Sequence, residues 1–377
     1  MVEKAPIEPP AAPTPDAAAI HDVKPDPPLV GYEDGFFLRT PDGASKLRIR
    51  GLVQPRFTLV EPSLTAAPGD VSASFAVQRA QIELVGHVFT KDISFALKTE
   101  FGRGAAFVKD AYLDLKILDG VVVRAGLYKR PFQRQQLASD WRLAFFDRNL
   151  TEETFKGGRD IGLSLHDALE QGPSIEWSAG VFSGTSEKPK VSGDVVIDPD
   201  GGVGVLDNVQ ISNVPKLFSP TFAGRVGFNS SPALKPYSEV DVDGGGFRFG
   251  TSLGVLDTFD IVKNTSLARF CVDGIVKFEH FTATGAVVLS VPGAFNEGPD
   301  GVGAFLQAGV LLQDRVSPGM RYSIVNQVAE GVIEQEIAGN LTVLLFGQNV
   351  LWGIEGGTNV VDGVPDVRFR SQAQIAF

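Results

Sequence analysis

Arginine side chains recur at even spacings in two segments near opposite ends of this chain. Arg48, Arg50 and Arg56 alternate with apolar residues in the segment 46–60, and Arg368 and Arg370 do the same in the segment 365–377. Successive residues of an extended strand point to opposite faces. Guanidinium groups offer forked donors that match the oxygens of phosphate and similar anions. The spacing therefore predicts strands that each carry one cationic face suited to binding anions.

The elements that would carry these faces are short strands separated by turn residues. The period of two predicts sixteen strands, at 46–60, 73–89, 93–102, 107–118, 121–129, 159–166, 174–183, 221–229, 246–256, 267–278, 281–291, 301–312, 319–326, 334–346, 350–356 and 365–377. Tight turns alternate with longer loops, except that the connection 230–245 is long where a tight turn is expected. This alternation is typical of an up-and-down membrane barrel.

Each predicted strand has one apolar side and one ionic side. A soluble sandwich would turn the apolar sides inward, whereas an outer-membrane barrel turns them to lipid and the ionic sides to a watery lumen. Sixteen strands would be unusual for one soluble sheet system. We therefore predict an all-β, 16-stranded antiparallel transmembrane β-barrel with short periplasmic turns, longer extracellular loops and an inward-folding third loop. The barrel is expected over residues 36–377, preceded over residues 1–35 by a Pro/Ala-rich, disordered periplasmic linker.

The charge of the chain is unevenly distributed. The formal net charge is -11, which argues against nucleic acid as a partner, yet residues 46–134 contain fourteen Lys and Arg against eight Asp and Glu. The alternation directs further cations into the lumen: Arg79, Lys98, Arg225, Arg248, Arg269, Lys277 and Arg321. Rings of Arg and Lys in a pore favour anions and phosphate. The alternative is that these cations only neutralise lumen acids, such as Glu83, Glu100, Asp110 and Asp114.

Two further expectations concern how these residues come together. In a closed barrel the last strand pairs with the first, which is expected to place Arg368 and Arg370 beside Arg48 and Arg50. The loop 130–158 is long and contains its own apolar residues, so we expect it to fold into the lumen and bring arginines to a constriction. The alternative is an extracellular loop that packs on itself.

The enzyme-like motifs lack the context they need. Gly250-Thr-Ser-Leu-Gly254 matches the nucleophile-elbow pattern, but it lies within a strand alternation rather than a strand-turn-helix. Glu83 and His87 share a face, but two ligands do not make a metal site. We expect no catalytic residue, no metal and no cofactor.

Several motifs in order resemble the phosphate-selective porin O/P family. They are the segments 31–43, 47–57, 79–86 with Lys91-Asp92, 110–114, 125–132, 158–163, 179–184, 222–225 and 321–323. The resemblance covers residues 31–377 and is strongest before Gly184. It departs at Gln133-Arg134-Gln135-Gln136, where the family commonly has an acidic residue, and in the acidity of the whole chain.

The resemblance implies a sixteen-stranded barrel, usually a homotrimer, whose third long loop enters the lumen and whose cations conduct anions. By position it places Lys129, Arg130, Arg134, Arg148 and Arg159 near the constriction or its rim. The function expected from the sequence is an outer-membrane porin, in contact with outer-membrane lipid of a Gram-negative cell, that passively conducts small anions such as phosphate or polyphosphate. The alternatives are a general, weakly selective porin and a non-conducting envelope scaffold with a plugged lumen. The N-terminal tail could bind a periplasmic partner.

Overall fold

A computed structural model describes residues 29–61, 71–104, 106–167, 172–184, 190–197, 204–212, 219–260, 265–292, 300–328 and 330–377. Most of the expected linker, residues 1–28, lies outside the described residues. Side chains of the segments 190–197 and 204–212 are likewise outside the description.

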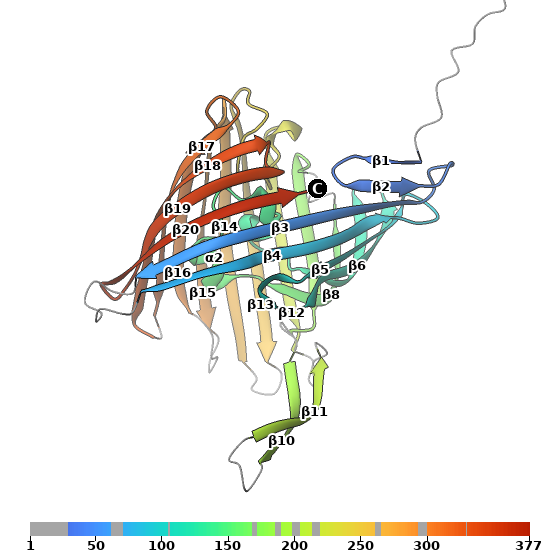
Figure 1. Cartoon of the computed structure of the whole chain (residues 1–377). Coiled ribbons are helices and arrows are strands. Elements are labelled where there is room, and N and C mark those ends of the chain that lie inside the picture. Colours follow the sequence, from blue (N-terminus) through green and yellow to red (C-terminus); the bar gives the residue numbers. More distant parts are fainter. Residues whose placement is uncertain are drawn as a thin grey trace, which may run out of the picture.

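The chain forms a closed antiparallel barrel of sixteen strands (Figure 1). The strands in order are β3 (Lys46–Glu61), β4 (Ser72–His87), β5 (Ile93–Glu100), β6 (Phe107–Leu118), β7 (Val121–Lys129), β8 (Arg159–His166), β9 (Ile175–Phe182), β12 (Thr221–Asn229), β13 (Arg248–Asp260), β14 (Thr265–Phe278), β15 (Phe281–Pro292), β16 (Gly301–Val310), β17 (Val316–Gln327), β18 (Val332–Phe346), β19 (Val350–Val361) and β20 (Val364–Ala376). Pairing of β20 with β3 closes the ring. The predicted fold class is confirmed.

Two short hairpins lie outside the ring of sixteen. The first joins β1 (Val30–Tyr32) to β2 (Phe36–Arg39), and β2 pairs with the start of β3, beyond the point where β20 ends. Residues 30–32, which the sequence analysis assigned to the linker, are therefore part of the sheet. The second hairpin joins β10 (Lys190–Ile197) to β11 (Gly204–Ser212) in the connection between β9 and β12.

The apolar faces of the strands point outward. In β12, Phe222, Val226 and Phe228 are about half exposed on the outer surface, while Arg225 and Asn229 on the alternate face are buried. The same division holds in β20, where Phe369 and Ile375 are exposed and Gln372 is buried. An apolar outer surface with a polar interior is the inverse of a soluble sandwich and matches a barrel in lipid.

The two ends of the barrel carry different connections. We call the end where β3 begins and β20 finishes the terminal end, and the opposite one the loop end. Turns 119–120, 279–280 and 347–349 lie at the terminal end together with the much longer connection 230–247. The loop end carries the connection 130–158, which we call the lumen loop, but also the two-residue turn 362–363.

Helical structure is confined to connections. The lumen loop contains α1 (Arg134–Leu137), η2 (Asp140–Arg142) and α2 (Leu150–Phe155), and single 3-10 turns lie at η1 (Gly102–Gly104) and η4 (Pro232–Leu234). Among the described residues, no helix is long and apolar enough to span a membrane.

The outward apolar face gives a first prediction. Val226→Lys, at the middle of β12, is expected to lower the free energy of unfolding in lipid vesicles by about 2–4 kcal/mol, because a charge at the bilayer midplane loses its hydration. Phe346→Lys, at the terminal end of β18, is the control and is expected to cost at most about 1 kcal/mol. Urea titration in phosphatidylcholine vesicles measures both, and equal costs would contradict a lipid-facing β12.

Candidate functional site

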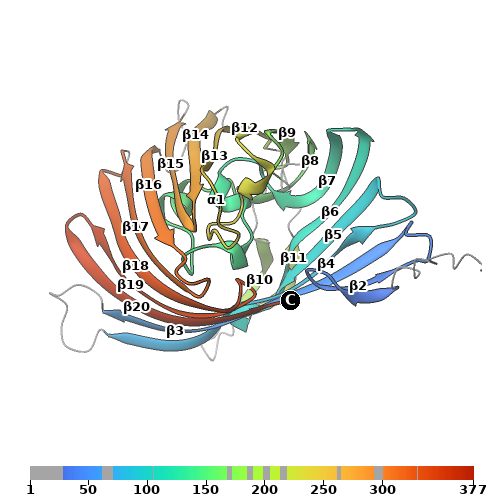
Figure 2. The ribbon, with the colours of Figure 1, turned by 90° about the horizontal axis from the view of Figure 1, so that it is seen from above.

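The lumen loop lies inside the barrel and packs against one side of its wall. Figure 2 shows α1 within the ring of strands. Phe132 and Phe155 of the loop are fully buried in an apolar cluster with wall residues that include Phe182. Two wall glycines make room for this contact. A Cβ at Gly254 would lie 2.5 Å from the Phe132 carbonyl oxygen, and one at Gly303 would lie 2.7 Å from Thr151 Cγ2.

Buried ion pairs fasten the loop to the same wall. Asp273 Oδ2 lies 2.7 Å from Arg225 Nη1, and Asp273 Oδ1 lies 3.0 Å from Arg134 Nε of the loop. Glu176 completes the group at 3.3 Å from Arg225 Nε. All four side chains are nearly inaccessible to solvent. The pairing therefore serves to hold the loop rather than to meet a permeating ion.

The connection 230–247 also folds inward, from the terminal end, and meets the lumen loop. Tyr237 packs with Ala138 and Leu143 of the loop. Glu239 accepts hydrogen bonds from Gln135 Nε2 at 2.7 Å and from the Ala144 backbone at 2.9 Å. Two connections from opposite ends thus fill one half of the lumen.

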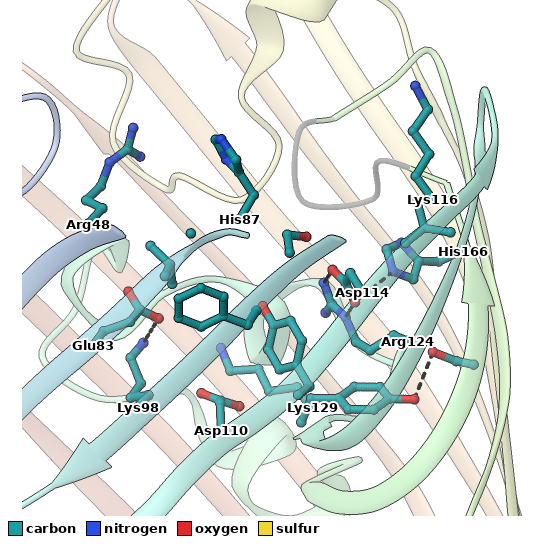
Figure 3. Close-up of a pocket in the computed structure, with 18 of the residues that line it drawn as sticks. Arg48, Glu83, His87, Lys98, Asp110, Asp114, Lys116, Arg124, Lys129 and His166 are labelled. Atoms are coloured by element: carbon teal, nitrogen blue, oxygen red, sulfur yellow. Dashed lines mark hydrogen bonds and ion pairs between the residues drawn. The ribbon is translucent and has the colours of Figure 1, made fainter. Parts of the chain in front are cut away.

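The other half of the lumen contains open cavities. A cavity of about 580 Å³ opens on the terminal side of the lumen loop and is lined mainly by β3 to β8 (Figure 3). Lys98 and Glu83 face each other in it at 3.1 Å, with Lys129 and Asp110 nearby. Two lining cations pair with the first hairpin: Lys46 Nζ lies 2.6 Å from Glu33, and Arg50 Nη2 lies 2.6 Å from Asp34.

A second cavity of about 590 Å³ lies on the loop-end side. Its lining includes Arg79, Arg103, Arg148, Arg368 and Arg370 together with Asp147. These residues come from β4, β20, the connection 101–106 and the lumen loop.

A layer of charged groups separates the two cavities. Asp140 of the lumen loop lies 2.8 Å from Arg148, 3.1 Å from Lys109 and 3.7 Å from Arg79. Gln81 donates to the same carboxylate at 2.9 Å. This layer joins the loop to the wall, and its cations are held by an acid that the loop supplies; that it forms the constriction stays a prediction.

The acids of the lumen loop differ in protonation tendency. Burial disfavours the charged form of Asp147, but the hydrogen bond from Arg56 and the charges of Arg79 and Arg370 outweigh it and hold the Asp147 pKa well below its usual range. Burial raises the pKa of Glu152 well above its usual range, because the opposing charge of Arg148 is weaker. Asp147 is thus a permanent anion in the lumen.

The predicted site residues divide into two sets. Eight of the fourteen line the cavities: Arg48, Arg50, Lys98 and Lys129 on the terminal side, and Arg79, Arg148, Arg368 and Arg370 on the loop side. The other six are buried in contacts within the protein: Arg56, Arg130, Arg134, Arg159, Arg225 and Arg248. Arg159 pairs with Asp110 at 2.9 Å, Arg248 with Asp241 at 2.7 Å, and Arg130 with Asp160 at 3.6 Å. Arg134, Arg225 and Arg248 are buried in ion pairs within the protein, and their expected role in anion binding stays a prediction.

The expected neighbourhood of the first and last strands is wrong. Antiparallel pairing sets Arg368 opposite Val60 and Arg370 opposite Thr58, at the far end of β3 from Arg48 and Arg50. The error arose because strands that run in opposite directions bring the start of one beside the finish of the other. Arg370 instead lies near Arg56, and both contact Asp147.

Sequence reasoning missed two loop acids and one wall cation that pairs with them. Asp140, Asp147 and Lys109 were not among the predicted site residues, although Lys109 follows the outward-facing Val108 in β6. The length of the connection 230–245 was the only sign that a second segment enters the lumen.

The rejected enzyme and metal motifs have structural explanations. Ser252 is buried and hydrogen-bonded to Asp273 and Arg225, as part of the group that holds the lumen loop. Within the described ranges, no group of three or more His, Cys, Asp or Glu side chains could hold a metal ion.

Comparison with known proteins adds the family. A model of the family described as "Phosphate-selective porin O and P" matches residues 67–235, which confirms the resemblance that the sequence motifs indicate. The match covers just under half of the chain, and together with the closed barrel it indicates an outer-membrane porin. No curated protein matches its sequence.

Solved structures share the fold of this porin. The anion-selective porin from Comamonas acidovorans is 14% identical, with a TM-score of 0.57, covering 88% of this chain and 100% of its own. The outer-membrane channel DcaP of Acinetobacter baumannii is 11% identical, with a TM-score of 0.58 and coverage of 90% and 99%. The trimer form of OmpT of Vibrio cholerae is 12% identical, with a TM-score of 0.54 and coverage of 89% and 100%.

The buried ion pairs give a second prediction. Arg225→Gln is expected to lower the free energy of unfolding of the porin by about 3–5 kcal/mol, because it leaves buried carboxylates of Asp273 and Glu176 under-compensated. Arg103→Gln, at an exposed arginine that bonds Gln78, is the control and is expected to change it by less than about 0.5 kcal/mol. Urea unfolding followed by tryptophan fluorescence measures both. A small effect of Arg225→Gln would contradict the role of this ion-pair group in holding the lumen loop.

Proposed function

We propose that this porin passively conducts small anions, with phosphate or polyphosphate as preferred permeants. The observation that carries the proposal is the charge of the cavity linings. The terminal-side cavity is lined by eight Lys and Arg against five Asp and Glu, and the loop-side cavity by five against four. A chain of net charge -11 thus presents excess positive charge where ions would pass. Positive pore linings favour anions.

The path follows the open half of the lumen, between the lumen loop and the wall formed by β3 to β8. Lys98 and Lys129 lie on the terminal side of the constriction, and Arg79 and Arg148 on the loop side. An anion crossing the layer would pass between these cations in turn. Phosphate is the finer part of the proposal, and it draws on the family match and on the forked geometry of the arginines.

Extensive ion pairing favours a second candidate, a general and weakly selective porin. Arg124 pairs with Asp114 at 2.7 Å, Arg321 with Glu336 at 2.6 Å and Arg370 with Glu355 at 2.9 Å. Cations neutralised in this way attract a passing anion less strongly. The excess of Lys and Arg over Asp and Glu in the cavity linings favours the anion channel over the general porin.

Assembly and partners are further parts of the proposal. We infer a homotrimer in outer-membrane lipid, supported by the apolar outer face and by the trimer form recorded for a structure of the same fold. A periplasmic partner for the N-terminal tail stays a prediction, because the tail lies outside the described residues.

The decisive experiment measures reversal potential in a planar bilayer across a KCl gradient. The wild type is expected to prefer chloride, and added phosphate is expected to reduce the chloride current. No conductance would favour the scaffold function, and cation preference would contradict the anion pathway.

One ion pair at the rim of the terminal-side cavity allows a sharper test. Arg50 and Asp34 lie 2.6 Å apart and both are partly exposed. Arg50→Gln removes the cation and is expected to lower the anion preference, whereas Asp34→Asn removes its counter-charge and is expected to raise it. The same reversal-potential measurement applies to both variants. Shifts of the same sign would show that the lining charges do not set selectivity.

A further inference from the structure

Three arginines from the barrel wall converge on one carboxylate of the lumen loop. Asp147 Oδ2 lies 2.6 Å from Arg56 Nη1 and 3.3 Å from Arg370 Nη1. Asp147 Oδ1 lies 3.1 Å from Arg56 Nη2 and 3.0 Å from Arg79 Nη2. Both oxygens therefore accept charge-assisted hydrogen bonds, the strong kind in proteins. Such a set of donors is what a bound phosphate or sulfate would receive from a protein.

The three arginines come from three neighbouring strands at the place where the barrel closes. Arg370 is on β20, Arg56 on β3 and Arg79 on β4, so their positions are fixed by the backbone ladder. The carboxylate comes from a connection rather than from the wall. Of the wall acids, Glu355 pairs with Arg370 at 2.9 Å, which leaves the charge of Arg56 and Arg79 to be balanced by the lumen loop.

The arrangement faces open space. The Asp147 side chain retains 23% of its exposure and lines the loop-side cavity together with Arg79 and Arg370. An anion that enters this cavity reaches Arg79 and Arg370 beside the carboxylate, whereas Arg56 is buried and becomes accessible only when the carboxylate moves away. By contrast, the acids that hold Arg225 on the opposite wall are almost fully buried.

We propose that Asp147 is a tethered anion: its carboxylate occupies an oxyanion-binding site formed by Arg56, Arg79 and Arg370, and a permeating oxyanion engages these donors by displacing it. The proposal rests on the proposed anion pathway and names a residue that sets its specificity. The ligand class is a tetrahedral oxyanion with several acceptor oxygens, such as inorganic phosphate.

Competition from Asp147 has a physical consequence for transport. An open cluster of three guanidinium groups would bind an oxyanion tightly and release it slowly, whereas conduction requires binding that is weak enough to leave. A built-in competitor weakens net binding without removing the donors. Chloride has no set of oxygens to match the donors, so the competition affects it less.

The test is Asp147→Asn, which deletes the charge and keeps the size of the side chain. Isothermal titration of the purified porin with inorganic phosphate is expected to show at least about tenfold tighter binding than in the wild type, the change that one charge-assisted hydrogen bond is worth. Half-block of the chloride current by phosphate is expected to shift to lower concentration by the same factor.

Glu153→Gln is the matched control. Glu153 lines the same cavity but pairs with Lys156 at 3.4 Å, and both are about half exposed. Its substitution deletes the same charge from the same cavity and is expected to leave phosphate binding unchanged. The double variant Arg79→Gln with Asp147→Asn is expected to bind phosphate less tightly than Asp147→Asn alone, because it lacks one of the arginine donors.

Two results would overturn the proposal. Equal tightening by Asp147→Asn and Glu153→Gln would show a general field effect, and no tightening by Asp147→Asn would show that the arginines do not form an anion site. Should Asp147→Asn fail to fold, Asp147→Ser deletes the same charge and carries the same expectation. Titration measures phosphate binding without ion flow. Cation preference in the bilayer would therefore contradict the proposed anion pathway, whereas the titration would still test the Asp147 proposal on its own.

Discussion

The closed backbone ladder is the constraint on which the rest of this structure depends. In lipid, an unpaired strand edge would leave N–H and C=O groups without partners, so β20 must pair with β3. Sixteen strands enclose a lumen too wide for wall side chains to fill. The chain fills it instead with two connections, the lumen loop and residues 230–247, and both are rich in buried polar groups. Closure therefore determines that the interior is a polar, loop-filled space.

Ion pairs hold the lumen loop on two sides of the lumen, and the two sides differ in their exposure to water. On one side, Arg225, Asp273 and Arg134 form a dry group that fixes the loop to the wall. On the other, Asp147, whose side chain is 23% exposed, contacts Arg79 and Arg370 beside an open cavity. The same type of pairing thus serves as an anchor where water is excluded and as part of the pathway lining where it is admitted. Burial, rather than residue type, separates the two roles.

Local periodicity made much of the fold predictable, while pairing and loop placement were not. The alternation of Phe222, Val226 and Phe228 with Arg225 correctly indicated which face of β12 meets lipid, because side-chain direction follows from the strand period alone. The neighbours of Arg368 and Arg370 needed the direction of pairing, and the sequence analysis had it reversed. Asp140 and Asp147 were missed because their roles depend on cations distant in sequence, and the first hairpin was missed because Pro-rich sequence runs close to its start.

The contact between two connections inside the barrel affects the order in which the protein folds. Gln135 and Glu239 are 104 residues apart in the sequence, and the strands between them must be in place before the two side chains can meet. Contacts of such long range form slowly, because the chain must first be ordered over the whole interval. The lumen contents are therefore expected to settle late in assembly, so that a newly inserted barrel passes through a wider, water-filled stage before its interior closes in.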